Sequence, residues 1–100
     1  MSAVFRALAD PTRRRVLTLL RAGPLSAGEL ASHFDVSKAT MSAHFSVLRE
    51  ADLVTSSKSG TTITYYLNLS VLEEALLEFT SLFGIQPKQT PAEEPHEDII

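Results

Sequence analysis

The sequence predicts a mainly α-helical domain with a small β-hairpin, in which four helices precede the hairpin and one follows it. Up to residue 51, apolar side chains recur at helical spacing between capping residues and turns. After residue 52, two short runs of β-branched and aromatic residues flank a glycine, as in a hairpin. Two short helices with a tight turn between them, followed directly by a hairpin, form a winged helix-turn-helix. An arbitrary small α+β domain is the alternative.

The first two helices have clear ends in the sequence. Residues 2–8 are predicted to form a short helix, whose apolar side consists of Val4, Phe5 and Leu8. Asp10 is a suitable N-cap for the second helix, and Pro11 fits its first position because the missing N–H has no partner there. We expect this helix to run to about residue 22, before Gly23. Its inward side chains are Val16, Leu17 and Leu20.

The third helix begins with a recognisable capping pattern. Pro24 starts a loop, after which Ser26 and Glu29 match a capping box. The pattern predicts a helix over residues 27–34. Its inward side chains are Leu30 and Phe34.

The fourth helix is amphipathic, with an unusually small outward face. Residues 35–36 form a tight turn, Ser37 is the N-cap, and the helix ends near residue 51. The residues predicted to face inward are Met41, Phe45 and Leu48. The opposite side carries Ala39, Ser42, Ala43 and Ser46, flanked by Lys38, Arg49 and Glu50. Small side chains suit a helix that approaches another molecule closely.

The hairpin is predicted from two β-type segments, residues 53–57 and 61–67, with residues 58–61 between them. On the second strand, Ile63, Tyr65 and Leu67 face one way and Thr62, Thr64 and Tyr66 the other. Ser70 and Glu73 match a further capping box, which predicts a last helix that ends before Gly84.

Charge divides the chain into two parts. The 100 residues have a net charge of −3, but residues 1–84 hold eight basic and eight acidic side chains. Residues 85–100 hold one lysine, four acidic side chains and three prolines. The sequence therefore predicts a folded domain over residues 1–84 and a disordered acidic tail over 85–100.

The composition also excludes several classes of protein. The absence of cysteine excludes disulfides, thiolate metal sites and thiol redox switches. No segment has the apolar length of a signal peptide or a membrane span, so we expect a cytoplasmic protein.

Three stretches are similar to one known family: "FRALADPTRRRVLTLL", "LSAGELASHFDVSKATMSAHFSVLREADLV" and "KSGTTITYYLN". They resemble the ArsR-type winged helix-turn-helix repressors over residues 3–83, and within them the SdpR-type autorepressors. The resemblance implies a homodimer formed through the first and last helices. It also implies a repressor that binds an operator in double-stranded DNA, with the helix at residues 37–51 in the major groove. Asp52 replaces a glycine usual in the family, and the wing carries only Lys58 where more basic residues are usual.

The outward face of the fourth helix is the main candidate for DNA contact. Alanine can meet a thymine methyl group, and serine can bond a base edge or a phosphate. No Arg, Asn or Gln occupies the centre of this face, so specificity should depend partly on DNA shape. The predicted DNA-binding residues are Ser37, Lys38, Ala39, Thr40, Ser42, Ala43, Ser46, Arg49, Lys58, Thr61 and Arg13. The alternative function is a winged-helix protein–protein interaction module that does not bind DNA.

Other polar residues have more than one interpretation. Arginines at positions 13–15 oppose the dipole of the helix that they begin, which favours a phosphate contact or an ion pair. The wing tip at residues 58–62 touches DNA or is an ordinary polar hairpin. His44 lies at the border of the apolar face, where it is a partly buried structural residue or a base contact, and His33 is predicted to be solvated.

The last helix has an apolar surface wider than its own domain needs. Its stripe consists of Leu72, Ala75, Leu76, Phe79, Leu82 and Phe83, with Val71 and Leu77 outside it. The extra width predicts a homodimer interface, and a larger self-packed core is the alternative. The predicted interface residues are Val4, Phe5, Leu8, Leu72, Leu76, Phe79 and Phe83.

The sequence predicts no enzyme, cofactor or metal site. It has no cysteine nucleophile, no Gly-rich phosphate loop and no paired acidic pocket, and its three histidines are far apart. Metal-sensing members of the family that it resembles have cysteines at the start of the third helix, where this chain has Ser26 and Gly28. A second family site uses histidines in the last helix, which here has none. Residues 93–100 could hold a cation weakly or be simply disordered. The sequence identifies no inducer or sequestering protein.

Overall fold

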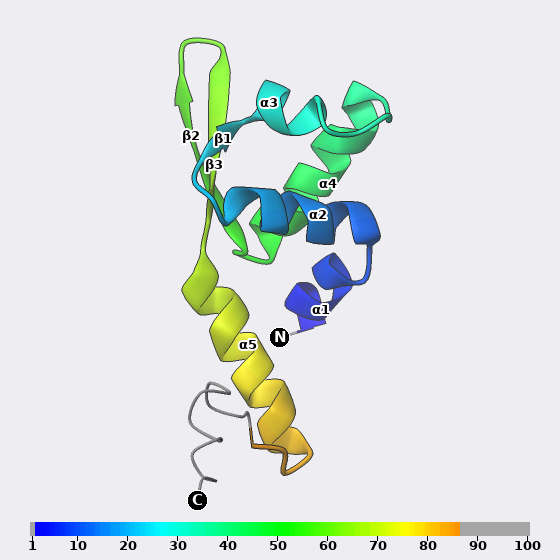
Figure 1. Ribbon diagram of the computed structural model, residues 1–100, viewed down its shortest axis with the longest axis vertical. Helices are drawn as coiled ribbons and strands as arrows, with labels where there is room; N and C mark the ends of the chain where they lie inside the picture. Colours follow the sequence, from blue (N-terminus) through cyan, green and yellow to red (C-terminus); the bar gives the residue numbers. More distant parts are fainter. Residues whose placement is uncertain (1, 87–100) are drawn as a thin grey trace, which may run out of the picture.

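The computed structural model describes residues 2–86 (Figure 1). The elements in chain order are α1 (Ser2–Leu8), α2 (Pro11–Leu20), β1 (Leu25–Ser26), α3 (Ala27–Ala31), α4 (Lys38–Glu50), β2 (Val54–Ser59), β3 (Thr62–Leu67) and α5 (Leu69–Leu82). Most of the predicted tail, residues 87–100, lies outside the described part. None of the helices within residues 2–86 is long and apolar enough to cross a membrane.

Helices α1 to α4 surround one hydrophobic core beside a small antiparallel sheet with strand order β1-β3-β2. Figure 1 shows that β2 and β3 extend beyond the helices as a wing, and that α5 leaves the end of β3 and runs away from the body. The largest fully buried side chains are Leu30, Met41, Leu48, Leu53 and Val16. They come from α2, α3, α4 and the segment before β2, so the helix-turn-helix unit forms the centre of the domain.

Three helix starts follow the predicted caps. The side chain of Asp10 accepts a hydrogen bond from the backbone N–H of Arg13 at 3.1 Å, and the side chain of Ser37 accepts one from Thr40 at 3.1 Å. In the capping box, Ser26 accepts from the backbone N–H of Glu29 at 3.0 Å, and the Glu29 carboxylate accepts from the Ser26 N–H at 2.8 Å. Each bond satisfies an N–H that the helix itself leaves unpaired.

The predicted third helix is too long, because α3 ends at Ala31. The backbone N–H groups of His33 and Phe34 bond to carbonyls three residues back, in turns rather than in α-helix. The Ser32 hydroxyl donates to the Glu29 carbonyl at 2.7 Å, which is the local competition by which serine weakens a helix end. Phe34 still packs against the core, so its inward orientation is confirmed.

The loop predicted after Pro24 contains a short strand, β1. Leu25 pairs with Tyr65 and Ser26 with Thr64 of β3. The hairpin turn is also tighter than predicted, because Lys58 and Ser59 belong to β2 and only Gly60 and Thr61 connect the strands. Gly60 has a φ of 62°, which a glycine adopts without steric cost.

The capping box predicted at Ser70 and Glu73 is wrong. The N-cap of α5 is Asn68, and it makes no side-chain capping bond to the helix. Its backbone N–H donates to the carbonyl of Leu53 at 2.9 Å, and its side-chain amide donates to the carbonyl of Asp52 at 3.1 Å. These bonds fix the chain next to the end of α4, so the helix begins one residue after them. Asp52 has a φ of 60°, a left-handed conformation that aspartate adopts more readily than most residues.

Candidate nucleic-acid interface

Helix α4 separates its apolar and polar sides as the sequence predicts. Met41, Phe45 and Leu48 are at most 6% exposed and lie in the core. The residues predicted to contact DNA on or beside this helix are all exposed: Ser37, Lys38, Ala39, Thr40, Ser42, Ala43, Ser46 and Arg49. The structure therefore presents one continuous outward face with small residues at its centre, Lys38 at its start, and both Arg49 and Glu50 at its end.

The wing is held next to α4 by an aromatic contact. The rings of Phe45 on α4 and Tyr65 on β3 are stacked, with centroids 4.6 Å apart and an interplanar angle of 30°. Burial raises the pKa of Tyr65, and the positive charge of Arg49 partly opposes this rise. Lys58 and Thr61 are exposed at the tip of the wing, so both predicted wing contacts are accessible.

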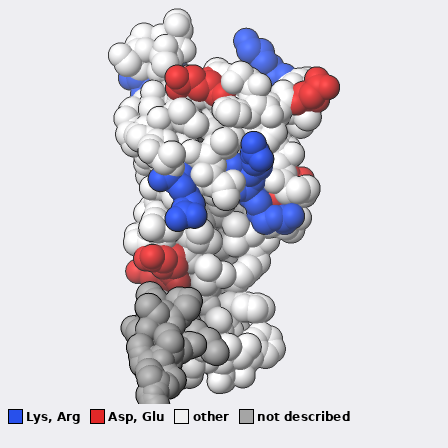
Figure 2. Space-filling model, viewed as in Figure 1, with Lys and Arg blue, Asp and Glu red and all other residues white. Residues whose placement is uncertain are grey.

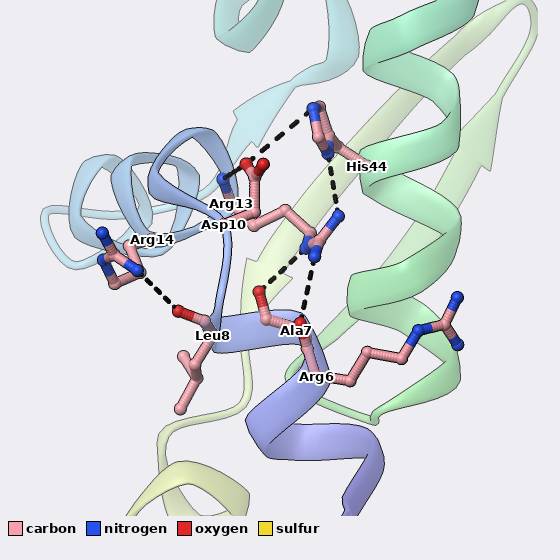
Figure 3. A network of polar contacts seen from close by, with 7 residues as sticks. All are labelled: Arg6, Ala7, Leu8, Asp10, Arg13, Arg14 and His44. Atoms are coloured by element: carbon pink, nitrogen blue, oxygen red, sulfur yellow. Dashed lines mark hydrogen bonds and ion pairs between the residues drawn. The ribbon is translucent and has the colours of Figure 1, made fainter.

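Arg13 joins three helices (Figure 3). Its Nε donates to the carbonyl of Ala7 at 2.8 Å, and its Nη2 donates to the carbonyl of Arg6 at 3.0 Å. Its Nη1 lies 3.1 Å from Nδ1 of His44 on α4. The guanidinium thus satisfies carbonyls at the end of α1 and connects them to α4, and the Arg6 carbonyl also accepts from the backbone N–H of Ala9 at 3.3 Å.

This cluster assigns a hydrogen-bonding role to His44. A guanidinium only donates, so Nδ1 of His44 accepts and the ring proton of neutral His44 lies on Nε2. That nitrogen is 3.9 Å from a carboxylate oxygen of Asp10, and the His44 side chain is only 15% exposed. The prediction of a partly buried histidine is confirmed, and His33 is exposed as expected.

Asp10 is the acidic member of the cluster. Burial raises the pKa of its carboxyl group, but hydrogen bonds from the backbone N–H groups of Arg13 and Thr12, together with the nearby charge of Arg13, outweigh this effect. The net result is a pKa below the usual value for aspartate. Asp10 therefore caps α2 and stays ionised next to His44.

The sequence did not reveal what Arg13 and its neighbour do within the fold. The Nη1 of Arg14 also donates to a carbonyl of the same helix end, that of Leu8, at 2.8 Å. An arginine at the start of a helix can therefore cap the end of the preceding helix, a third role besides phosphate contact and ion pairing. The only sequence feature that indicates this capping role is the short link between the two helices, residues 9–10.

The predicted interface on α1 and α5 is largely uncovered in the single chain. Phe79 is 42% exposed and Phe83 is 65% exposed, and Leu76 is also exposed. Phe5 packs on Phe79 with ring centroids 4.9 Å apart, and Phe79 meets Phe83 at 5.2 Å. Of the other residues predicted for the interface, Leu8 and Leu72 are half-buried. Val4 lies in the core of the chain itself, so little of its side-chain surface is accessible to a partner.

Comparison with known proteins identifies the family. A family model described as a helix-turn-helix domain matches residues 8–57. The transcriptional repressor SdpR of Bacillus subtilis (strain 168) is 41% identical over 76 residues, which are 76% of this chain and 84% of that protein. A solved structure of an ArsR family transcriptional regulator is similar with a TM-score of 0.72 and 31% identity, and the match covers 86% of this chain and 92% of that chain. This chain belongs to the ArsR-type winged helix-turn-helix transcriptional repressors.

A further ArsR-type relative extends the comparison. The arsenical resistance operon repressor of Staphylococcus xylosus is 38% identical over 73 residues, which are 73% of this chain and 70% of that protein. In this ArsR-type chain, no group of three or more His, Cys, Asp or Glu residues within positions 2–86 is arranged to hold a metal ion. In the matched segment, α3 and α4 are the helices of the helix-turn-helix unit, and β2 begins the wing.

Proposed function

We propose that this protein is a homodimeric repressor in the cytoplasm that binds a two-fold operator in double-stranded DNA and blocks transcription of its own or a neighbouring operon. The outward face of α4 is the main structural evidence for this function. This face is fully exposed and small at its centre, with Lys38 at its start and Arg49 next to Glu50 at its end. Each dimer would insert two copies of α4 into successive major grooves. The protein has no enzymatic role in this proposal.

The shape and charge of this face favour DNA over a protein partner. A protein-binding helix usually buries large apolar or aromatic anchors, whereas the centre of this face carries Ala39, Ser42, Ala43 and Ser46. A helix with small residues can lie deep in the major groove while flanking cations reach the phosphates. The named repressors among the relatives support the same conclusion.

The apolar surface on α1 and α5 supports the dimer. It is formed by Phe5 of α1 together with Leu76, Phe79 and Phe83 of α5 and its C-cap, and none of these residues belongs to α4. Leu8 and Leu72 flank it. A second copy of the same surface would cover these rings by a two-fold contact, and it would leave both α4 faces free for DNA.

The salt dependence of DNA binding tests this function. Fluorescence anisotropy with labelled DNA from the promoter of the protein's own gene should show an affinity that falls steeply as salt rises, because phosphate contacts release counterions. Lys38→Ala should weaken binding by about 1 kcal/mol and reduce the slope of log affinity against log salt by about 1.

Arg6→Ala is the matched control, because Arg6 is an exposed cation on α1, outside the elements predicted to touch DNA. This variant should leave the DNA affinity and its dependence on salt concentration nearly unchanged. Binding that does not respond to salt, or equal losses in the two variants, would contradict the proposed interface.

A further inference from the structure

His44 lies halfway along α4, on the side of the helix that faces Arg13 of α2 (Figure 3). Its contact with Arg13 is, within residues 2–86, the one side-chain hydrogen bond that joins α4 to another helix. The buried side chains of α4, Met41, Phe45 and Leu48, make apolar contacts, which are not directional. His44 therefore supplies a directional contact that fixes how α4 lies against α1 and α2.

The connection continues from Arg13 to the aromatic surface on α1 and α5. Arg13 donates to the carbonyls of Ala7 and Arg6 at the end of α1. Phe5 of the same helix packs on Phe79 of α5, with ring centroids 4.9 Å apart. A series of contacts thus runs from the middle of α4 through α1 to the surface that a second copy covers in the proposed dimer.

The contact between His44 and Arg13 requires a neutral imidazole ring. Arg13 only donates, so Nδ1 of His44 accepts while it carries no proton. A protonated ring has an N–H at both nitrogens and a positive charge, so it would direct a donor and a cation at the guanidinium. On its other side, Nε2 lies 3.9 Å from a carboxylate oxygen of Asp10, which attracts the charged ring. Proton uptake therefore changes the preferred partner of His44 from Arg13 to Asp10.

Other charged groups have little part in this exchange. Helix α1 contributes Arg6, whose guanidinium points away from His44 in Figure 3. On α4 itself, every charged side chain is at least five residues from His44, which is more than one helical turn. Within residues 2–86, only Arg13 and Asp10 are hydrogen-bonded or ion-paired to the ring, so these two groups set its response to acid.

We propose that His44 is a positioning residue for DNA recognition, and that its neutral ring holds α4 in the orientation that the operator requires. This inference rests on the proposed function, because it concerns how a dimer presents its two α4 helices. Those helices must match two half-sites at a fixed spacing. A change in the angle between α4 and α1 occurs in both chains of a symmetric dimer, so it alters the fit to both half-sites. Acid therefore weakens DNA binding through His44, although added positive charge alone would strengthen it.

Fluorescence anisotropy with promoter DNA at about pH 8 and about pH 5.5 tests the proposal, because histidine side chains gain a proton in this range. The unchanged protein should bind about fivefold more weakly at the lower pH, as expected for the loss of one hydrogen bond. His44→Asn places an amide oxygen near the position of Nδ1, and this acceptor takes up no proton in the same range. The affinity of this variant should not fall in acid.

His33→Asn is the matched control, because His33 is an exposed histidine beyond the end of α3. It should keep the full loss of affinity in acid, and circular dichroism at both pH values should show that each protein is folded. An equal loss in His44→Asn and the unchanged protein would overturn the proposal. Tighter DNA binding by the unchanged protein at the lower pH would also overturn it.

A measurement without DNA separates this inference from the proposed function. Nitrogen NMR of the free protein reports which ring nitrogen of His44 carries the proton, and at about pH 8 it should be Nε2. The resonance of the Arg13 Nε–H group should shift together with that of His44 as the pH falls. A proton on Nδ1, in a protein that still binds DNA with a steep salt dependence, would refute the role of His44 and leave the proposed function intact. Failure to bind DNA at about pH 8 would overturn both.

Discussion

Helices α4 and α5 are both amphipathic, but only α4 has its large apolar side chains covered by the rest of the same chain. In α4, Met41, Phe45 and Leu48 are at most 6% exposed, and the outward side is small or polar. In α5 only Ala75 is buried, while Leu76, Phe79 and the C-cap residue Phe83 remain 42% to 65% exposed. The difference shows that an apolar stripe predicts packing but does not say which molecule supplies the other surface. We expect substitutions in α4 to act on folding or DNA binding, and substitutions in α5 to act on assembly.

The largest expected effect is in the core side of α4. Leu48→Ala should lower the free energy of unfolding by about 3 kcal/mol, because Leu48 is fully buried and the change leaves a cavity. Urea denaturation at a fixed protein concentration measures it. Ser46→Ala, two residues away on the exposed side, should change the value by less than about 0.5 kcal/mol. A similar loss of unfolding free energy in both variants would mean that α4 does not have one buried side and one solvent-exposed side.

The next effect concerns the uncovered side of α5. Phe83→Glu should weaken dimerisation by about 2 kcal/mol or more, because it places a charge among apolar side chains of the proposed interface. Sedimentation equilibrium should show a shift toward monomer, with little change in helical content. Ser81→Glu adds the same charge to another side of the same turn and should leave the association constant unchanged. A dimer that withstands Phe83→Glu would place its interface elsewhere.

A smaller effect is expected at Arg13, which connects α4 to the end of α1 through hydrogen bonds. Arg13→Gln removes the bonds to Ala7 and Arg6 and the contact with His44, so unfolding free energy should fall by about 1–2 kcal/mol. Arg15→Gln, on the same helix, is the control and should have little effect. The sequence also predicts that Arg13 touches DNA. Reduced DNA affinity with unchanged stability would support that role over the structural one.

The smallest effect is a pH dependence at Asp10. Its pKa is lower in the folded protein than the usual value, so its ionised form stabilises the fold above the unfolded pKa. This stabilisation is lost as pH falls through the folded pKa. Asp10→Asn keeps a good N-cap but removes the charge. The difference in unfolding free energy between the two proteins should be largest near neutral pH and should vanish in acid, as measured by urea denaturation at several pH values.

The features that the sequence predicted correctly are local. The caps at Asp10, Ser26 and Ser37 depend on side chains that reach backbone groups three residues away, so sequence spacing is enough to find them. The buried and exposed sides of α4 follow from helical periodicity in the same way.

The features that it missed depend on contacts between distant segments. Strand β1 has two residues and exists because Leu25 and Ser26 pair with β3, about 40 positions later. Hydrogen bonds from Asn68 to Leu53 and Asp52 set the start of α5. The helix therefore does not begin at the capping box that the sequence predicts at Ser70. At the candidate site, the role of Arg13 required knowing that the end of α1 lies beside the start of α2.

In the proposed complex, two α5 helices join the chains while two α4 helices read the DNA. Footprinting of the purified protein on its operator tests this arrangement, with the stoichiometry of the complex measured by sedimentation. We expect two chains per site and two inverted half-sites whose centres are about 34–36 Å apart, one turn of DNA. Protection of a single asymmetric site by one chain would contradict it.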